Sequence, residues 1–317
     1  MRPGTVVFFV LLAVGVALAL GWRGAVLDDR RVAAGATIFT GIFVQAVPFL
    51  VLGTVVSGAI AAWVTPAMIA RALPRSQVAS VGAGGLAGAL LPGCECASVP
   101  VSARLMDRGV PQAAALAFLL SAPAINPVVL VSTAVAFPAE PLMVAARFAA
   151  SLVTAVVMGG LWARFGDPTL ITRRVMHDDE ARGWSGFADS MRQDFLQSAA
   201  YLSMGALFVA VLHVVVPASV VDSLAGQVLL GIFLMAVLAV VLSVCSEADA
   251  FVAASMSQLP LLPRLVFLVV GPVVDLKLIA MQAGAFGARF AARFSAATFV
   301  VAIAAATGVG ALILGWR

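Results

Sequence analysis

Of the 317 residues in the chain, 62% are hydrophobic and 11% are charged, whereas a soluble domain carries roughly 25% charged residues. The mean hydropathy of +1.10 agrees with this bias, and together the two values exclude an ordinary soluble domain. The net charge of +4 comes from basic residues in short connections, which is the topology signal of a multi-pass membrane protein. It is not the footprint of a nucleic-acid-binding surface, so we expect a lipid bilayer as partner and no nucleic acid.

Long apolar stretches follow one another along the chain, and each approaches or exceeds the roughly 20 residues that a helix needs to cross a bilayer. They cover residues 5–22, 34–62, 78–101, 109–137, 141–163, 195–217, 224–245, 261–282 and 295–316. Strict two-residue alternation is absent, which disfavours a transmembrane barrel. We therefore predict an all-α integral membrane protein with about eight to ten transmembrane or re-entrant helices. The first stretch resembles a signal peptide in its flanks, but we interpret it as a first membrane span because the stretches after it are also apolar.

One long hydrophilic connection, residues 164–192, carries both basic and acidic side chains. The positive-inside bias places it in the cytoplasm. Within a single membrane permease domain, 1–317, it separates a predicted first repeat, 34–163, from a predicted second repeat, 193–316.

The two halves share landmarks in the same order. Residues 43–53 align with 195–205, and an offset of 149 residues superposes Cys96 on Cys245 and Asn126 on Asp275. Many secondary transporters are built from inverted repeats, with the substrate site near the bilayer midplane where discontinuous helices meet. We expect the same arrangement of two internal repeats in this chain.

Four polar breaks interrupt the apolar stretches, at residues 92–96, 121–127, 245–250 and 271–277. Irregular backbone at membrane depth persists only where protein or a water-filled cavity surrounds it, because an unpaired backbone group in hydrocarbon costs several kcal/mol. These breaks are therefore the candidate functional site.

All three cysteines, Cys94, Cys96 and Cys245, lie at these breaks. Three cysteines are too few for a disulfide framework. Thiols bind soft ions and electrophiles such as Cu(I), Zn(II) or trivalent arsenic, so the three cysteines are candidate substrate ligands. The alternative interpretation is that each cysteine is a small buried hydrophobe.

Three carboxylates accompany the cysteines: Glu95, Glu247 and Asp249. Each costs about 2.5–3.5 kcal/mol at bilayer depth on insertion scales, which makes a binding or proton-relay role the default hypothesis. The alternative for Glu247 and Asp249 is that they cap the start of the next helix, where acidic side chains are favoured.

Prolines mark the other two breaks. Asn126 follows Pro123, and its counterpart Asp275 follows Pro272 and precedes Lys277. A proline has no backbone N–H and leaves a carbonyl one turn earlier available as a ligand. We count Asn126, Pro123 and Pro272 as candidate substrate-binding residues, and Asp275 and Lys277 as an intramembrane ion pair for ion coupling. Alternatively, Lys277 snorkels to the interface.

The four breaks together resemble the signatures of the predicted bacterial permeases grouped with ArsP-type organoarsenical efflux permeases. The motifs that carry the resemblance are Leu91-Pro-Gly-Cys-Glu-Cys96, Phe118-Leu-Leu-Ser-Ala-Pro-Ala-Ile-Asn-Pro127, Cys245-Ser-Glu-Ala-Asp-Ala-Phe251 and Gly271-Pro-Val-Val-Asp-Leu-Lys277. The resemblance implies a multi-pass permease of the bacterial plasma membrane, some members of which export trivalent organoarsenicals. It also implies that all the candidate residues named above occupy motif positions of that family, except Glu95, which occupies a variable position.

The sequence therefore predicts a secondary transporter, not an enzyme, that exports a thiophilic solute such as a trivalent organoarsenical or a soft metal species. The cysteines would bind the solute, and Glu95, Glu247, Asp249, Asp275 or Lys277 would couple transport to an ion. The chain has no Walker motif or catalytic triad, and we expect no cofactor and no resident metal. The alternative is a membrane thiol-disulfide oxidoreductase that passes electrons through Cys96 and Cys245. A metal-chaperone platform is a third interpretation, and a homo-oligomer or an accessory membrane protein is a candidate partner.

Overall fold

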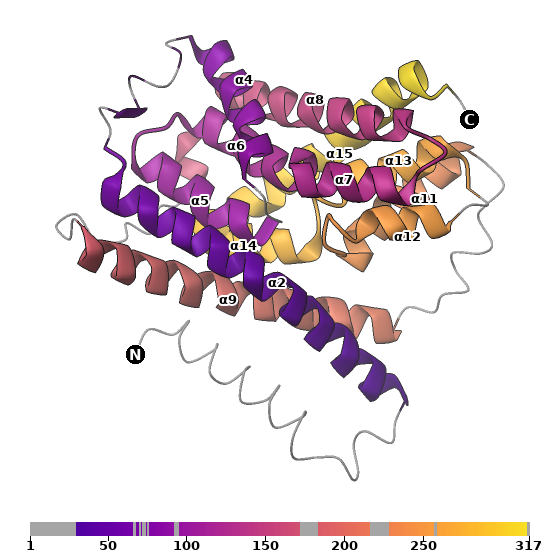
Figure 1. The fold of residues 1–317 in the computed structure, drawn as a ribbon, viewed down its shortest axis with the longest axis horizontal. Helices are drawn as coiled ribbons and strands as arrows, with labels where there is room; N and C mark the ends of the chain where they lie inside the picture. Colours follow the sequence, from indigo (N-terminus) through magenta and orange to yellow (C-terminus); the bar gives the residue numbers. More distant parts are fainter. Residues whose placement is uncertain are drawn as a thin grey trace.

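The computed structural model describes residues 30–65, 68–69, 71, 74, 76–91, 95–171, 183–215, 228–256 and 259–315. The predicted first span, 5–22, and Cys94 lie outside these residues. Helices make up almost all of the described chain, and no strand occurs in it (Figure 1). The elements are α2 (Arg30–Trp63), α4 (Gln77–Ala87), η1 (Gly88–Leu90), α5 (Glu95–Asp107), α6 (Gln112–Ile125), α7 (Pro127–Ala136), α8 (Leu142–Phe165), η2 (Pro168–Leu170), α9 (Trp184–Val215), α11 (Val228–Leu242), α12 (Asp249–Ser255), α13 (Leu261–Val270), α14 (Leu276–Phe286) and α15 (Ala288–Ile313).

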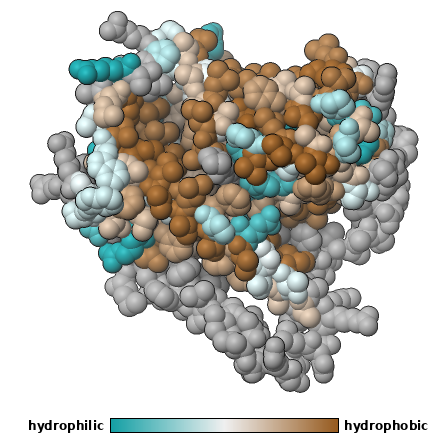
Figure 2. Space-filling view, viewed as in Figure 1, coloured by the Kyte–Doolittle hydropathy of each residue, from teal (hydrophilic) through white to brown (hydrophobic). Residues whose placement is uncertain are grey.

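Four stretches of the described chain are helical, long and apolar enough to cross a membrane: Gly35–Trp63, Gln112–Ala136, Leu142–Phe165 and Ala288–Ile313. Apolar side chains cover much of the face shown in Figure 2, as expected of a surface against lipid. Together these features confirm the prediction of an all-α multi-pass membrane protein.

The polar breaks divide three of the predicted stretches into shorter helices. Stretch 78–101 becomes α4 and α5, 109–137 becomes α6 and α7, and 261–282 becomes α13 and α14. At 1.5 Å per residue, the 13 residues of α5 extend roughly 20 Å, which is less than the roughly 30 Å hydrocarbon core. Helix α5 alone therefore cannot span the membrane, and its first residue, Glu95, is buried inside the protein whereas its last, Asp107, is exposed.

Short helices from the two halves of the chain contact each other at the centre of the molecule. Helix α5 packs on α14, and α7 packs on α12. These contacts bring the first break beside the fourth and the second break beside the third. The helices that begin at the breaks, α5, α7, α12 and α14, therefore lie in the middle of the molecule (Figure 1).

Two long helices, α2 and α9, pack side by side and cover α5 and α14 (Figure 1). Each uses a glycine for this contact. A Cβ added at Gly53 would overlap the backbone of Ala97 in α5, and one added at Gly205 would lie 2.9 Å from Cα of Lys277 in α14. Because only a hydrogen fits at these positions, the glycines set how closely α2 and α9 approach the helices that carry the breaks.

Helix α9 begins at Trp184, inside the predicted hydrophilic connection 164–192. The polar residues that end this connection are thus the first turns of a helix that continues into the apolar region. Aromatic contacts hold this end in place, because Trp184 and Phe187 both pack against Trp63 at the end of α2. The polar composition of these turns concealed their helical structure.

Candidate functional site

A buried lysine lies where the breaks meet. The Lys277 ammonium, in the first turn of α14, is 2.9 Å from Glu95 Oε1 and 3.5 Å from Asp275 Oδ2. Lys277 is fully buried, and Glu95 and Asp275 are each 1% exposed. The predicted Asp275–Lys277 ion pair is therefore present, and the alternative in which Lys277 snorkels to the interface is wrong. The second partner, Glu95, comes from α5 in the other half of the chain.

Two cysteines adjoin this lysine. The sulfur of Cys245 is 3.9 Å from Lys277 Nζ, and Cys96 directly follows Glu95, whose carboxylate is 2.9 Å from the same ammonium. Cys96 is fully buried and Cys245 is 2% exposed. The structure thus brings together one cysteine from each half, beside a cation and two carboxylates.

A second buried ion pair joins the third break to α8. Arg147 Nη2 is 2.9 Å from Asp249 Oδ2 and also donates to the Ser246 carbonyl at 3.1 Å, while Nη1 donates to Thr133 Oγ1 at 2.8 Å. Arg147 has no exposed surface. Asp249 is the first residue of α12 and makes no side-chain cap bond there. Asp249 is thus an acidic residue in the first turn of a helix, as the capping alternative expects, and its carboxylate also pairs with a buried guanidinium.

Glu247 lies in the turn between these two ion pairs. Both of its carboxylate oxygens are buried and have no hydrogen-bond partner among the described residues. The charges of Glu95, Arg147 and Lys277 are close enough to act on it. We call the six residues Glu95, Arg147, Glu247, Asp249, Asp275 and Lys277 the charged centre.

The two helix starts that follow the proline breaks have the same geometry. Asn126 begins α7, where its side-chain oxygen accepts the Val129 N–H at 3.0 Å, and Asp275 begins α14, where Oδ1 accepts the Leu278 N–H at 2.6 Å. The Asn126 amide nitrogen donates to the Ala122 carbonyl at 2.9 Å. Asn126 therefore bridges its own break, as a helix N-cap and as a donor to a carbonyl left over by the preceding helix.

The two candidate prolines, Pro123 and Pro272, are both buried. Pro123 lies inside the last turn of α6, and Pro272 lies in the turn between α13 and α14. Neither can donate to the carbonyl four residues earlier, which belongs to Leu119 for Pro123 and to Leu268 for Pro272. Their position agrees with a role in ending these helices beside the site.

Ser243 fixes how α11 ends next to the site. Its backbone is in the left-handed region, with φ of 47°, the only such non-glycine residue in the described chain. Its hydroxyl oxygen accepts the Leu276 N–H at 3.2 Å and donates to the Val240 carbonyl at 2.8 Å. A strained backbone persists only where its surroundings hold it, and here the start of α14 supplies that support.

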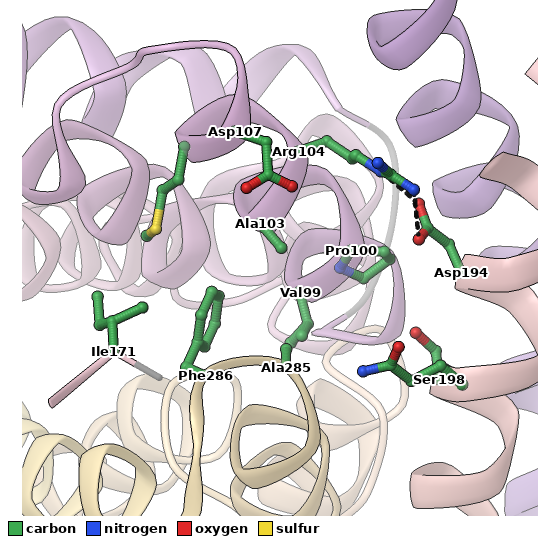
Figure 3. Close-up of a pocket in the computed structure, with 12 residues that line it drawn as sticks. Val99, Pro100, Ala103, Arg104, Asp107, Ile171, Asp194, Ser198, Ala285 and Phe286 are labelled. Atoms are coloured by element: carbon green, nitrogen blue, oxygen red, sulfur yellow. Dashed lines mark hydrogen bonds and ion pairs between the residues drawn. The ribbon is translucent and has the colours of Figure 1, made fainter. Parts of the chain in front are cut away.

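A small cavity of about 60 Å³ lies between α5, α9 and α14 (Figure 3). A third buried ion pair between the halves closes one side of it, with Arg104 Nε and Nη2 at 3.0 and 3.1 Å from the two oxygens of Asp194. The Ser57 hydroxyl donates to the same carboxylate. Val99, one helical turn from Glu95, also lines the cavity. The cavity therefore reaches within one turn of the charged centre.

Sequence reasoning missed Arg147 and the Arg104–Asp194 pair as parts of the site. A signal for Arg147 exists, because an arginine inside an apolar stretch is a functional candidate by default. No such signal exists for Arg104 and Asp194, since both lie near the ends of predicted segments and resemble interfacial charges.

A multi-pass helical protein whose charged residues converge on its interior has the architecture of a membrane transporter. The chain belongs to the ArsP_1 family of predicted permeases, whose family model matches residues 32–310. It is a membrane permease and not an enzyme, and it resides in a bacterial membrane as a multi-pass protein.

Two bacterial proteins are similar over most of their length. "UPF0718 protein YcgR" of Bacillus subtilis (strain 168) is 35% identical over 280 residues, which cover 84% of this chain and 93% of that protein. The "Putative two-component membrane permease complex subunit" of Streptococcus mutans serotype c is 30% identical over 275 residues, 84% of this chain and 91% of that protein. No solved structure matches the chain.

Proposed function

We propose that this permease is a secondary transporter that exports a thiophilic solute, such as a trivalent organoarsenical or a soft metal species. The observation that carries the proposal is the meeting of Cys96 and Cys245 beside Lys277, where two buried sulfurs from opposite halves share one polar site. Soft electrophiles prefer sulfur ligands. Cys94, directly before α5, is the third proposed ligand.

The carboxylates of the charged centre supply the coupling in this proposal. Buried ionisable groups in a transporter are expensive, and they typically form ion or proton pathways. Glu95 and Asp275 pair with Lys277, Asp249 pairs with Arg147, and Glu247 is close enough for Glu95, Arg147 and Lys277 to act on its charge. A proton or another ion that binds this group would drive export against a solute gradient.

The proposal includes two inverted repeats, 34–163 and 193–316. Corresponding helices support it, because α4 to α8 and α11 to α15 follow the same order at the offset of 149 residues that superposes Cys96 on Cys245. Pro111 and Pro260 precede α6 and α13 in the same way. Reciprocal movement of such halves would expose the site first to one side of the membrane and then to the other.

An accessory membrane protein is the partner that we propose. The relative from Streptococcus mutans is named as a subunit of a two-component membrane permease complex. Co-purification of the tagged permease from its native membrane, with a second membrane protein recovered in equal amount, would support such a complex.

The transport proposal is tested in inverted membrane vesicles from cells that lack other arsenical exporters. We expect vesicles that contain the permease to accumulate a trivalent phenylarsenical, and the Cys96→Ser/Cys245→Ser variant to lose this accumulation. Met158→Leu, a core substitution in α8 at a 3% exposed position, is the control for expression and folding.

Unchanged accumulation by a well-expressed double variant would overturn the thiol mechanism. A Cys96–Cys245 disulfide that exchanges with an external thioredoxin-like protein would instead support the oxidoreductase. Protection of both cysteines from alkylation by the arsenical, without oxidation, supports transport.

A further inference from the structure

The charged centre does not balance its own charge. It contains four carboxylates, Glu95, Glu247, Asp249 and Asp275, and two cations, Arg147 and Lys277. With every group ionised, the centre would carry two more negative than positive charges. Five of the six residues are at most 1% exposed, and Glu247 is half-buried with both of its carboxylate oxygens buried, so bulk water solvates this excess poorly.

The excess has a definite location. Asp249 has its own cation, Arg147, at 2.9 Å. Glu95 and Asp275 share the single charge of Lys277. Glu247 has no cation within ion-pair distance among the described residues, and neither of its oxygens accepts a hydrogen bond there.

Unpartnered oxygens in the same group also point to bound positive charge. Glu95 Oε2 and Asp249 Oδ1 have no hydrogen-bond partner among the described residues, although each residue is only 1% exposed. Isolated ionised carboxylates in a low-dielectric interior are so costly that the group neutralises instead. Two positive charges are therefore required, either as protons or as a metal cation.

The arrangement favours protons. A metal cation needs several ligands that converge on one point, and the described residues contain no group of three His, Cys, Asp or Glu side chains placed to hold one. A proton needs only one carboxylate oxygen. We propose that Glu247 carries an exchangeable proton, that Glu95 and Asp275 share a second, and that Arg147 is a positioning residue. This proposal rests on the proposed ion coupling and names its ion and its carrier.

Arg147 makes Glu247 the carrier by holding the turn on which it lies. It bonds the Ser246 carbonyl and the Asp249 carboxylate on either side of Glu247, which fixes the turn and satisfies Asp249. The other charged groups that act on Glu247 are Glu95 on α5, Lys277 on α14 and its near neighbour Asp249 on α12. The nearest basic residue on α13, Arg264, lies over the ring of Phe137 instead.

The proposed step forms one O–H bond at Glu247 when a proton arrives from one aqueous side, and breaks it when the proton leaves to the other. Nothing is oxidised or reduced. Cys245 lies two residues from Glu247 in the same turn, so a solute on the sulfur and a proton on the carboxylate would influence each other directly.

Infrared difference spectroscopy of the full-length protein in lipid tests this proposal without any substrate. We expect a protonated-carboxyl band at neutral pH that shifts in heavy water, is lost in Glu247→Gln and moves in frequency in Glu247→Asp. Asp189→Asn, at a side chain that is 58% exposed, should leave the band unchanged. Absence of the band in the wild type, its persistence in Glu247→Gln, or its dependence on sodium instead of pH would overturn the proposal.

Folding and transport give second readouts. Glutamine has the shape of a protonated glutamate, so Glu247→Gln should unfold at the same temperature as the wild type or higher, and a clear loss of stability would contradict the proposal. In vesicles, Glu247→Gln should exchange the phenylarsenical across the membrane but lose accumulation driven by a proton gradient. A wild type that shows the carboxyl band but moves no arsenical would refute the proposed substrate and leave the proton site standing.

Discussion

Replacing Lys277 with methionine removes the one cation that Glu95 and Asp275 share. Methionine keeps most of the length and volume of the lysine stem, so the packing of α14 against α9 changes little. The two carboxyl groups, each on a residue that is 1% exposed, share one proton in the proposed state and would then keep one negative charge with no cation to balance it. We expect Lys277→Met to be strongly destabilised.

The magnitude follows from the burial of the ion pairs. Removing one partner of a buried ion pair costs about 3–5 kcal/mol, because it leaves an uncompensated buried charge. Here one cation serves two carboxylates, at 2.9 and 3.5 Å, so the upper part of this range applies. For a domain of 150–250 residues each kcal/mol shifts the melting temperature by about 2–4 °C, and we expect a decrease on the order of 10 °C for Lys277→Met.

Thermal unfolding of the purified protein, followed by tryptophan fluorescence, measures this decrease. The control is Arg192→Met, which removes an ion pair with Asp189 at 3.9 Å whose side chains are 76% and 58% exposed. An exposed pair contributes about 0–1 kcal/mol, so the control should unfold near the wild-type temperature. Replacing a cation with methionine should therefore lower stability strongly at the buried ion pair and hardly at all at the exposed one.

Neutralising the stranded carboxylates should restore stability. In the triple variant Glu95→Gln/Asp275→Asn/Lys277→Met no buried charge remains in this part of the centre, and asparagine still caps α14. We expect the triple variant to regain most of the lost stability. If Lys277→Met unfolds at the temperature of Arg192→Met, or if the triple variant is no more stable than Lys277→Met, the assignment of Lys277 as the shared cation is refuted.

Two further substitutions probe other parts of the site by the same assay. Arg104→Met leaves the Asp194 carboxylate buried without its cation and should lower the free energy of unfolding by about 3–5 kcal/mol. The double variant Arg104→Met/Asp194→Asn should recover most of this loss. An equally unstable double variant would show that packing, not charge, holds this contact. Asn126→Ala removes an N-cap, worth about 1 kcal/mol, and leaves the Ala122 carbonyl unsatisfied at a further cost of about 1–3 kcal/mol. Asn126→Asp keeps the cap on Val129 and should lose only the second contribution, and equal losses for the two substitutions would contradict this division.

Much of the architecture could be predicted from local sequence. Long apolar stretches with few charges identify the helices, because in lipid only a helix satisfies all of its backbone hydrogen bonds within a single segment. Proline and glycine mark where those helices break. The ion pair of Asp275 with Lys277 was also within reach, since the two residues are two positions apart and neither could leave the apolar stretch cheaply.

Helix boundaries were harder to predict where polar composition and helical structure coincide. The first turns of α9, from Trp184, are rich in charge, so their composition predicts that they belong to the hydrophilic connection 164–192. Their helical structure depends on continuation into an apolar helix and on aromatic contacts with Trp63. The residue composition of a segment indicates whether it lies against water or lipid, but it does not show where a helix begins or ends.

The sequence by itself determined that costly polar groups lie at membrane depth, and the tertiary structure decided which of them meet. Glu95 and Lys277 are 182 residues apart, Arg147 and Asp249 are 102 apart, and Arg104 and Asp194 are 90 apart. A buried charge requires a partner of opposite charge, but the sequence does not show which of the oppositely charged residues is that partner. The packing of α5 on α14, and of α7 and α8 around α12 and α13, selects the partner, because only packing fixes which side chains share a space that water cannot enter.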